Sequence, residues 1–175
     1  LMLNGTQIDT ADLKEQFRSN EWAFIFSKAL QDKRIRAAQL EHYMERINTF
    51  YRNDNYRPQK KYFISELVSS EYGLALLLDH HVNRPGHLMT KWKRDFLGKA
   101  LTNSGLTNPE VWTTAEEKQF IEAYLILRNA SNMTHAKQRA DRILRYLELD
   151  LLSDQRGSFY SPEKIVRKAQ SRALS

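Results

Sequence analysis

The sequence contains no cysteine among its 175 residues. Disulfide bonds, thiolate nucleophiles and cysteine-based zinc sites are therefore excluded. This absence leaves the compartment open, because a cysteine-free protein can work in the cytosol, in the periplasm or outside the cell. Long apolar runs are missing as well. The longest, Leu74 to Leu78, stops at Asp79 and falls far short of the roughly 20 residues that a membrane span requires.

Familiar targeting and nucleotide-binding motifs are also missing. Residues 1–10 lack the basic head and the apolar stretch of a secretory signal. No P-loop, glycine-rich dinucleotide turn, nucleophile elbow or zinc finger occurs, and no cofactor is predicted. Since the first residue is Leu rather than Met, we expect a processed chain, a fragment, or a chain whose natural beginning is missing.

The charge of the chain is strongly positive, with a net value of +6 and an isoelectric point near 9.5. A basic surface favours polyanionic partners such as nucleic acid, acidic glycans or anionic cell walls. Part of the excess lies in residues 155–175, where five basic side chains, Arg156 among them, face one acid. We interpret this segment as a solvated tail that contains a short helix.

Helical periodicity dominates the sequence, and no convincing pair of strands is found. Apolar stripes with i, i+3, i+4 spacing predict helices over about 19–30, 40–50, 59–78, 88–102, 113–128 and 132–147, with a last one from Ser161. The helix over 59–78 is expected to be the central buried one, because its second half is apolar nearly all round. The sequence therefore predicts one all-α domain over 1–175 with six to eight helices. Residues 153–175 are predicted to form a basic tail with a short helix.

The segment from Asp79 to His87 is the most unusual part of the chain, with three of the five histidines ahead of a Pro-Gly turn. Three interpretations stay open. A metal site would use four ligands, Asp79, His80, His81 and His87, but adjacent histidines rarely converge on one ion, and no metal is predicted. A substrate-contacting loop would use three donors, His81, Asn83 and Arg84. In a structural role the histidines would cap exposed carbonyl groups.

Asp79 follows five apolar residues, which predicts a carboxylate close to the core. An unpaired charge there would be very costly. Arg128 is the natural partner, because it closes the apolar helix 120–127 in the way that Asp79 closes 74–78. A second arginine, Arg139 or Arg142, is expected to complete the network.

Two carboxylates are candidates for acid catalysis. Glu66 lies on the predicted central helix and Asp79 follows its end, thirteen residues further along the chain. The two could form the acid pair that glycosidic hydrolysis requires. The simpler interpretation is that Glu66 is a solvated side chain on a helix surface.

Several motifs in a shared order resemble the C-terminal half of chitosanase-type enzymes, glycoside hydrolase family 46, in the lysozyme-like superfamily. The resemblance covers residues 20–152. The motifs are Glu21-Trp22-Ala23 with Ala29, Asp32, Arg36 and Tyr43; Leu78-Asp79-His80-His81 with Arg84-Pro85-Gly86; and Phe120 to Arg128 with Gln138-Arg139 and Leu147 to Leu151.

The resemblance implies a helical lobe that forms one wall of the substrate cleft in a peptidoglycan or chitosan hydrolase. It implies that Asp79 and Arg128 belong to a salt-bridge network behind the cleft, with His81, Asn83 and Arg84 at its rim. The family's catalytic carboxylates precede the matched region, so the catalytic acids are expected upstream of this chain; the alternative is that the chain has lost activity.

The resemblance extends to the C-terminal lobes of type VI secretion spike proteins, which attack peptidoglycan. It therefore implies a secreted protein, or one delivered to the periplasm, with a glycan polymer as substrate and an immunity-type inhibitor protein as a possible partner. The alternative is a non-catalytic, basic helical module that binds a protein partner or nucleic acid, and nucleic acid is the less favoured of these.

Overall fold

The computed structural model describes residues 2–3, 6–7, 15, 20–88 and 95–159. Within these ranges the fold is all-α, as predicted, with eight α-helices. The strands found there are a two-residue pair, β1 (Met2–Leu3) and β2 (Thr6–Gln7), which run antiparallel. The chain divides into two compact units, Leu1–Tyr43 and Met44–Ser175. Among the described residues, no helix combines the length and apolarity that crossing a bilayer demands.

The first unit contains helix α2 (Asn20–Ala29) and the beginning of helix α3 (Lys33–Tyr51), which continues into the second unit. Periodicity predicted both helices, although the expected N-cap of the first, Ser19, lies outside the described residues. The sequence predicts a buried stripe on α2 and the residue after it, which includes Ile25 and Leu30, but these side chains are 42% and 47% exposed. The observed hydrophobic core runs from Ile47 to Ala140.

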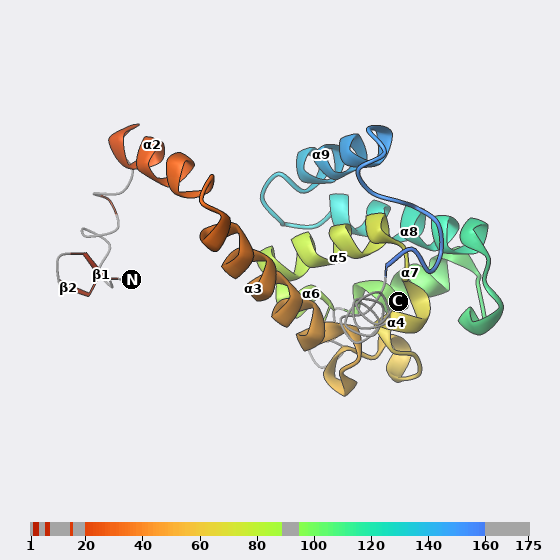
Figure 1. The fold of residues 1–175 in the computed structure, drawn as a ribbon. Coiled ribbons are helices and arrows are strands. Elements are labelled where there is room, and N and C mark those ends of the chain that lie inside the picture. The colour runs from red at the N-terminus through yellow and green to blue at the C-terminus, as the bar shows by residue number, and fades with distance from the viewer. Residues whose placement is uncertain (1, 4–5, 8–14, 16–19, 89–94, 160–175) are drawn as a thin grey trace, which may run out of the picture. The chain divides into compact units, whose positions relative to one another are not determined.

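The second unit is a layered helical body in which α9 lies over α5 and α8 (Figure 1). Its longer helices are α5 (Glu71–Asn83), α7 (Phe96–Ser104), α8 (Thr114–Asn129) and α9 (Ala136–Glu148). The shorter ones are η2 (Asp54–Tyr56), η3 (Pro58–Lys60), α4 (Ile64–Leu67), α6 (Pro85–Leu88) and η5 (Pro109–Val111).

The predicted continuous helix over 59–78 is wrong, although its second half is the central buried helix. The backbone of Val68 is extended, with φ −129° and ψ 121°, and the chain turns before α5 begins. The turn is stable because the Ser69 and Ser70 N–H groups donate to the Glu117 carboxylate instead of continuing a helix. The Ser70 side chain then caps α5 by accepting from Gly73 N.

Other helix ends follow the sequence signals closely. Thr113 caps α8, and Glu116 completes the predicted capping box by accepting from Thr113 N. Helix α7 ends at Gly105, whose φ of 67° suits a residue without a side chain. It was predicted over 88–102; residues 89–94, like the last predicted helix from Ser161, lie outside the described part of the chain.

Gly73 of α5 leaves no room for a side chain beside Val68 and Ile121 of α8. A Cβ added there would lie 2.6 Å from Val68 Cγ1 and 2.7 Å from Ile121 Cδ1. We expect Gly73→Ala to lower the free energy of unfolding, because overpacking costs about 1–3 kcal/mol and alanine regains roughly 1 kcal/mol through helix propensity. Gly86→Ala is the matched control, since its added Cβ would meet nothing within 4 Å. A Gly73→Ala midpoint in urea at or above that of the unmodified protein would contradict this account of the packing.

Candidate functional site

Three helices of the second unit meet at the carboxylate of Asp79, near the end of α5. The Arg128 guanidinium, from the last turn of α8, places Nη2 2.6 Å from Asp79 Oδ2. Arg139 of α9 donates from Nε to Oδ2 at 3.2 Å and from Nη2 to Oδ1. The structure thus brings together the three charged residues that the sequence predicted as a network, and both carboxylate oxygens are engaged.

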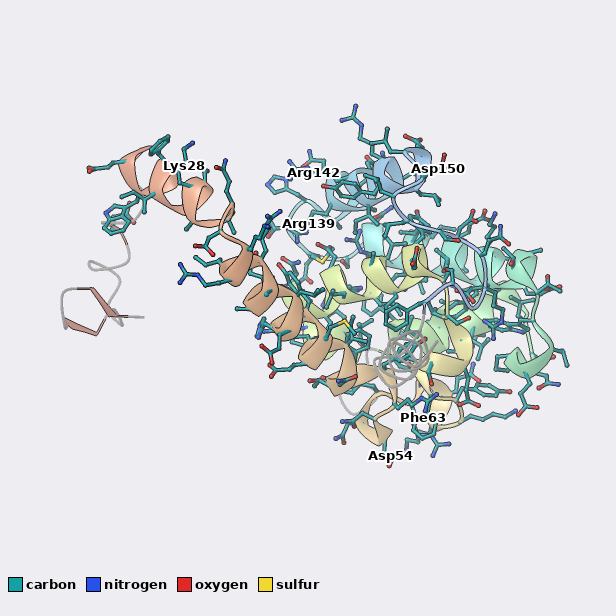
Figure 2. The ribbon with its side chains drawn as sticks, viewed as in Figure 1. Lys28, Asp54, Phe63, Arg139, Arg142 and Asp150 are labelled. Atoms are coloured by element: carbon teal, nitrogen blue, oxygen red, sulfur yellow. The ribbon has the colours of Figure 1, made fainter. Side chains whose placement is uncertain are left out.

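The two arginines differ in their exposure to solvent. Arg128 is completely buried, and its Nη1 also donates to the Ala136 carbonyl at the start of α9. The Arg139 side chain is 36% exposed, so the network opens to solvent on the α9 side. Figure 2 labels Arg139 and Arg142 on α9, Arg139 in its first turn and Arg142 at its middle, with Asp150 beyond its last residue. Arg142, the other predicted partner, makes no ion pair with Asp79.

The three predicted rim donors have separate environments. His81 is a correction, because it is 4% exposed and packs in the core against Phe50, at 4.8 Å between ring centroids. Its Nε2 bonds to the Tyr56 hydroxyl at 3.0 Å. The reason is that α5 continues past Asp79 to Asn83, which keeps His81 on an inner face. Asn83 is half-buried and donates to the Asp79 carbonyl at 2.7 Å, whereas Arg84 is exposed.

A buried chain of hydrogen bonds lies beside the Asp79 network. His80 Nδ1 bonds to the Tyr124 hydroxyl at 2.6 Å, and His80 Nε2 bonds to His87 Nδ1 at 2.9 Å. These hydrogen bonds between Tyr124, His80 and His87 were not predicted from the sequence. A signal was present, because His80 follows Asp79 and Tyr124 lies one turn before Arg128, so pairing the charges also joins these neighbours. The histidine nitrogens bond to one another and to the phenol, and the described residues contain no acid and histidine group able to hold a metal ion.

The buried histidines make stability depend on pH. Burial, followed by the nearby His87 and Arg128, lowers the pKa of His80 from 6.5 to about 3. Burial and Arg46 lower the pKa of His81 to about 4. Between these values and 6.5 the unfolded chain binds more protons than the folded one, so stability is complete above pH 6.5 and falls as the pH drops. We expect a slope of roughly 1.4 kcal/mol per pH unit for each histidine.

Urea unfolding at pH 7.5, 6 and 5 measures this slope. His135→Asn is a suitable control, because His135 is exposed and asparagine tolerates its φ of 54°. The control is expected to keep the full acid sensitivity. A midpoint that stays constant from pH 7.5 to pH 5 would show that the buried rings are not held neutral.

A second buried network joins the turn before α5 to the start of α8. Glu117 is completely buried and accepts from Ser69 N at 2.9 Å, Ser70 N at 2.7 Å and Arg156 Nη1 at 2.6 Å. Arg156 also donates to three carbonyls, those of Glu66, Leu67 and Pro109. Arg156 was predicted to lie in a solvated tail, and this is wrong, because its guanidinium bonds to the buried Glu117 and residues 153–159 hold the corner of the second unit together.

Glu66 and Asp79 belong to separate hydrogen-bonded groups. The Glu66 carboxylate accepts from Phe63 N and thereby caps α4. The Asp79 carboxylate is held by Arg128 and Arg139. Each carboxylate is therefore engaged in an internal role of its own, and no hydrogen bond in the described part of the chain joins the two.

A hollow of about 610 Å³ lies over the second network, lined by Tyr51, Trp112 and Arg156 among others. Most of its polar groups are already used inside the protein. The Tyr51 hydroxyl donates to the Val68 carbonyl at 2.8 Å, and Trp112 Nε1 donates to Thr107 O at 2.9 Å. Burial raises the pKa of Tyr51 to about 12. This hollow therefore has the character of a packed seam, with few donors free for a ligand.

The surface around Asp79 has donors that are still accessible, namely the half-exposed Arg139 and the exposed Arg84. This surface is the candidate functional site. No family model matches the chain, nor does any curated protein or solved structure match it.

Proposed function

We propose that this protein is the helical lobe of a hydrolase that cleaves a cell-wall glycan, peptidoglycan or chitosan, and that it forms one wall of the substrate cleft. The observation that carries the proposal is the Asp79 carboxylate held by Arg128 from one side and by Arg139 from the other. The residues involved are those that the family resemblance and the charge pattern single out.

The network supports this role through rigidity. Arg128 ties α5 to α8 and bonds to the first residue of α9, so the orientation of α9 is fixed where Arg139 reaches the surface. A guanidinium held in one orientation binds sugar hydroxyl or carboxylate oxygens at a smaller entropic cost than a mobile one. Arg84 and Asn83, at the end of α5, extend the same wall.

The chemistry of such a hydrolase needs two carboxyl groups: a protonated Glu that donates to the glycosidic oxygen and an Asp that activates water. Since Glu66 and Asp79 are committed to internal bonds, we place the catalytic acids upstream of this chain. Secretion or delivery to the periplasm, and an inhibitor protein that protects the producing cell, belong to the same proposal.

A second candidate function is a non-catalytic binding module. The net charge of +6 favours it, because a basic domain attracts polyanions at long range. Such a module would bind nucleic acid or an acidic protein without cleaving glycan.

A suspension of purified cell wall separates the two functions. We expect a longer polypeptide that includes the upstream residues to reduce the turbidity and release reducing ends. The 175-residue chain is expected to sediment with the wall without clearing it. Arg139→Gln in the longer polypeptide is expected to lower clearing at least tenfold, with Arg34→Gln, an exposed arginine of the first unit, as control. Salt-sensitive DNA binding, without sedimentation or clearing, would instead support the binding module.

A further inference from the structure

Two arginines on the outer face of α9 have no carboxylate partner in the part of the chain that the structure describes. Arg139 is paired with Asp79, and Lys137 is paired with Asp141 at 3.0 Å. Arg142 and Arg145 are exposed and form no such pair. Their positions, three and six residues after Arg139, continue the basic surface from the Asp79 network along α9.

Arg142 and Arg145 line a hollow of about 510 Å³ together with Tyr146, Glu148 and Leu149. Tyr146 is 52% exposed and Leu149 is 66% exposed, so the hollow offers an aromatic ring and an apolar side chain beside two guanidinium groups. The combination suits a ligand that has both carboxylate and small apolar groups.

We propose that this hollow binds the carboxylate-bearing peptide stems of peptidoglycan, and that it selects peptidoglycan over chitosan. The inference rests on the proposed function and names the substrate of the same wall. Guanidinium groups bind carboxylates through two parallel hydrogen bonds. Chitosan carries protonated amines, so a surface with two unpaired arginines repels it, whereas the alanine and carboxylate groups of a stem match Leu149 and the arginines.

The charge of the face argues for carboxylates rather than a nucleic-acid backbone. Proteins that bind DNA through its phosphates commonly make about 6–10 such contacts. Arg142 and Arg145 are accompanied by an acid in the hollow itself, Glu148, and by Asp141 on the same helix. Two unpaired guanidinium groups can bind one or two carboxylates of a ligand. They are too few to bind a chain of phosphates, which the neighbouring Glu148 carboxylate would repel.

The test uses co-sedimentation of the 175-residue chain with intact peptidoglycan and with the same glycan after an amidase has removed its stems. We expect the unmodified protein to bind the intact polymer at least tenfold more tightly than the stripped one. Arg142→Gln/Arg145→Gln is expected to lose this preference while it binds stripped glycan as before. Lys60→Gln/Lys99→Gln removes two exposed charges from other helices and is expected to keep the preference.

The outcomes separate the two proposals. Equal binding to intact and stripped glycan, or an unaltered preference in the Arg142/Arg145 variant, overturns this inference and leaves the proposed function standing. No sedimentation with either polymer overturns both. If the variant loses only its affinity for a short DNA duplex, the face binds nucleic acid and the inference is wrong. Circular dichroism checks that each variant is folded.

Discussion

Replacing Arg128 by methionine is expected to lower the free energy of unfolding by about 3–5 kcal/mol. The guanidinium is completely buried and lies 2.6 Å from the Asp79 carboxylate. Methionine fills much of the same volume but leaves a largely buried charge with one partner, Arg139, and leaves the Ala136 carbonyl without its donor. Urea unfolding monitored by circular dichroism measures the change.

Two further variants show whether the loss comes from the buried charge. Lys137→Met breaks an exposed pair with Asp141 on α9 and is expected to change stability by no more than about 0.5 kcal/mol. Combining Asp79→Asn with Arg128→Met is expected to cost less than the sum of the two single changes, because the first change removes the orphaned charge. An Arg128→Met protein as stable as the unmodified one, or strictly additive losses, would contradict the network.

Glu117→Gln is expected to have an effect of similar size, about 3–5 kcal/mol. The carboxylate is completely buried and is the shared acceptor for the Ser69 and Ser70 N–H groups and for Arg156. An amide keeps the shape but has one acceptor oxygen, and its NH₂ group faces donors, so a buried guanidinium contact and a backbone N–H lose their partner.

Glu116→Gln is the matched control for this change, since Glu116 is the neighbouring carboxylate and caps the exposed start of α8. It is expected to be clearly less destabilising than Glu117→Gln. Amide hydrogen exchange adds a local readout, because the Ser69 and Ser70 amides are expected to lose protection in the Glu117 variant. Equal losses for the two variants, with Ser69 and Ser70 still protected, would show that the corner does not depend on this carboxylate.

The parts of the fold that depend on local signals could be predicted from the sequence. The apolar run before Asp79 and the Thr113 capping box act within one or two helical turns, and the structure has a central helix and a capped α8 at these places. Asp79 and Arg128 could be paired because each follows an apolar run, and a buried charge without a partner of opposite sign is very costly.

The parts that depend on distant residues could not be predicted. The turn at 68–70 exists because Glu117, which lies 48 residues from Ser69, accepts its N–H. The local spacing of apolar residues, taken without that contact, predicts a continuous helix. Histidine is a polar residue that commonly lies at the surface. His81 is buried because Phe50 and Tyr56 pack around it. The exposed stripe of α2 shows the converse, since apolar spacing predicts a helix but does not supply the layer that would bury it.

The proposed wall links stability to function, because the same arginine that bonds to Asp79 reaches the surface. Arg128 bonds to the first residue of α9 and fixes the start of that helix. Arg139 bonds to the Asp79 carboxylate and is partly exposed to solvent. Arg142 and Arg145 extend the basic surface further along α9. A change that loosens the network is therefore expected to weaken glycan binding even where it removes no contact to the glycan.

The most direct measurement is an NMR titration of the isotope-labelled chain with soluble peptidoglycan fragments that retain their stems. The account predicts amide shift changes that cluster at the end of α5, at Asn83 and Arg84, and along α9 from Arg139 to Leu149. Shifts concentrated instead around Tyr51 and Trp112, or the absence of any shift at millimolar ligand, would contradict it.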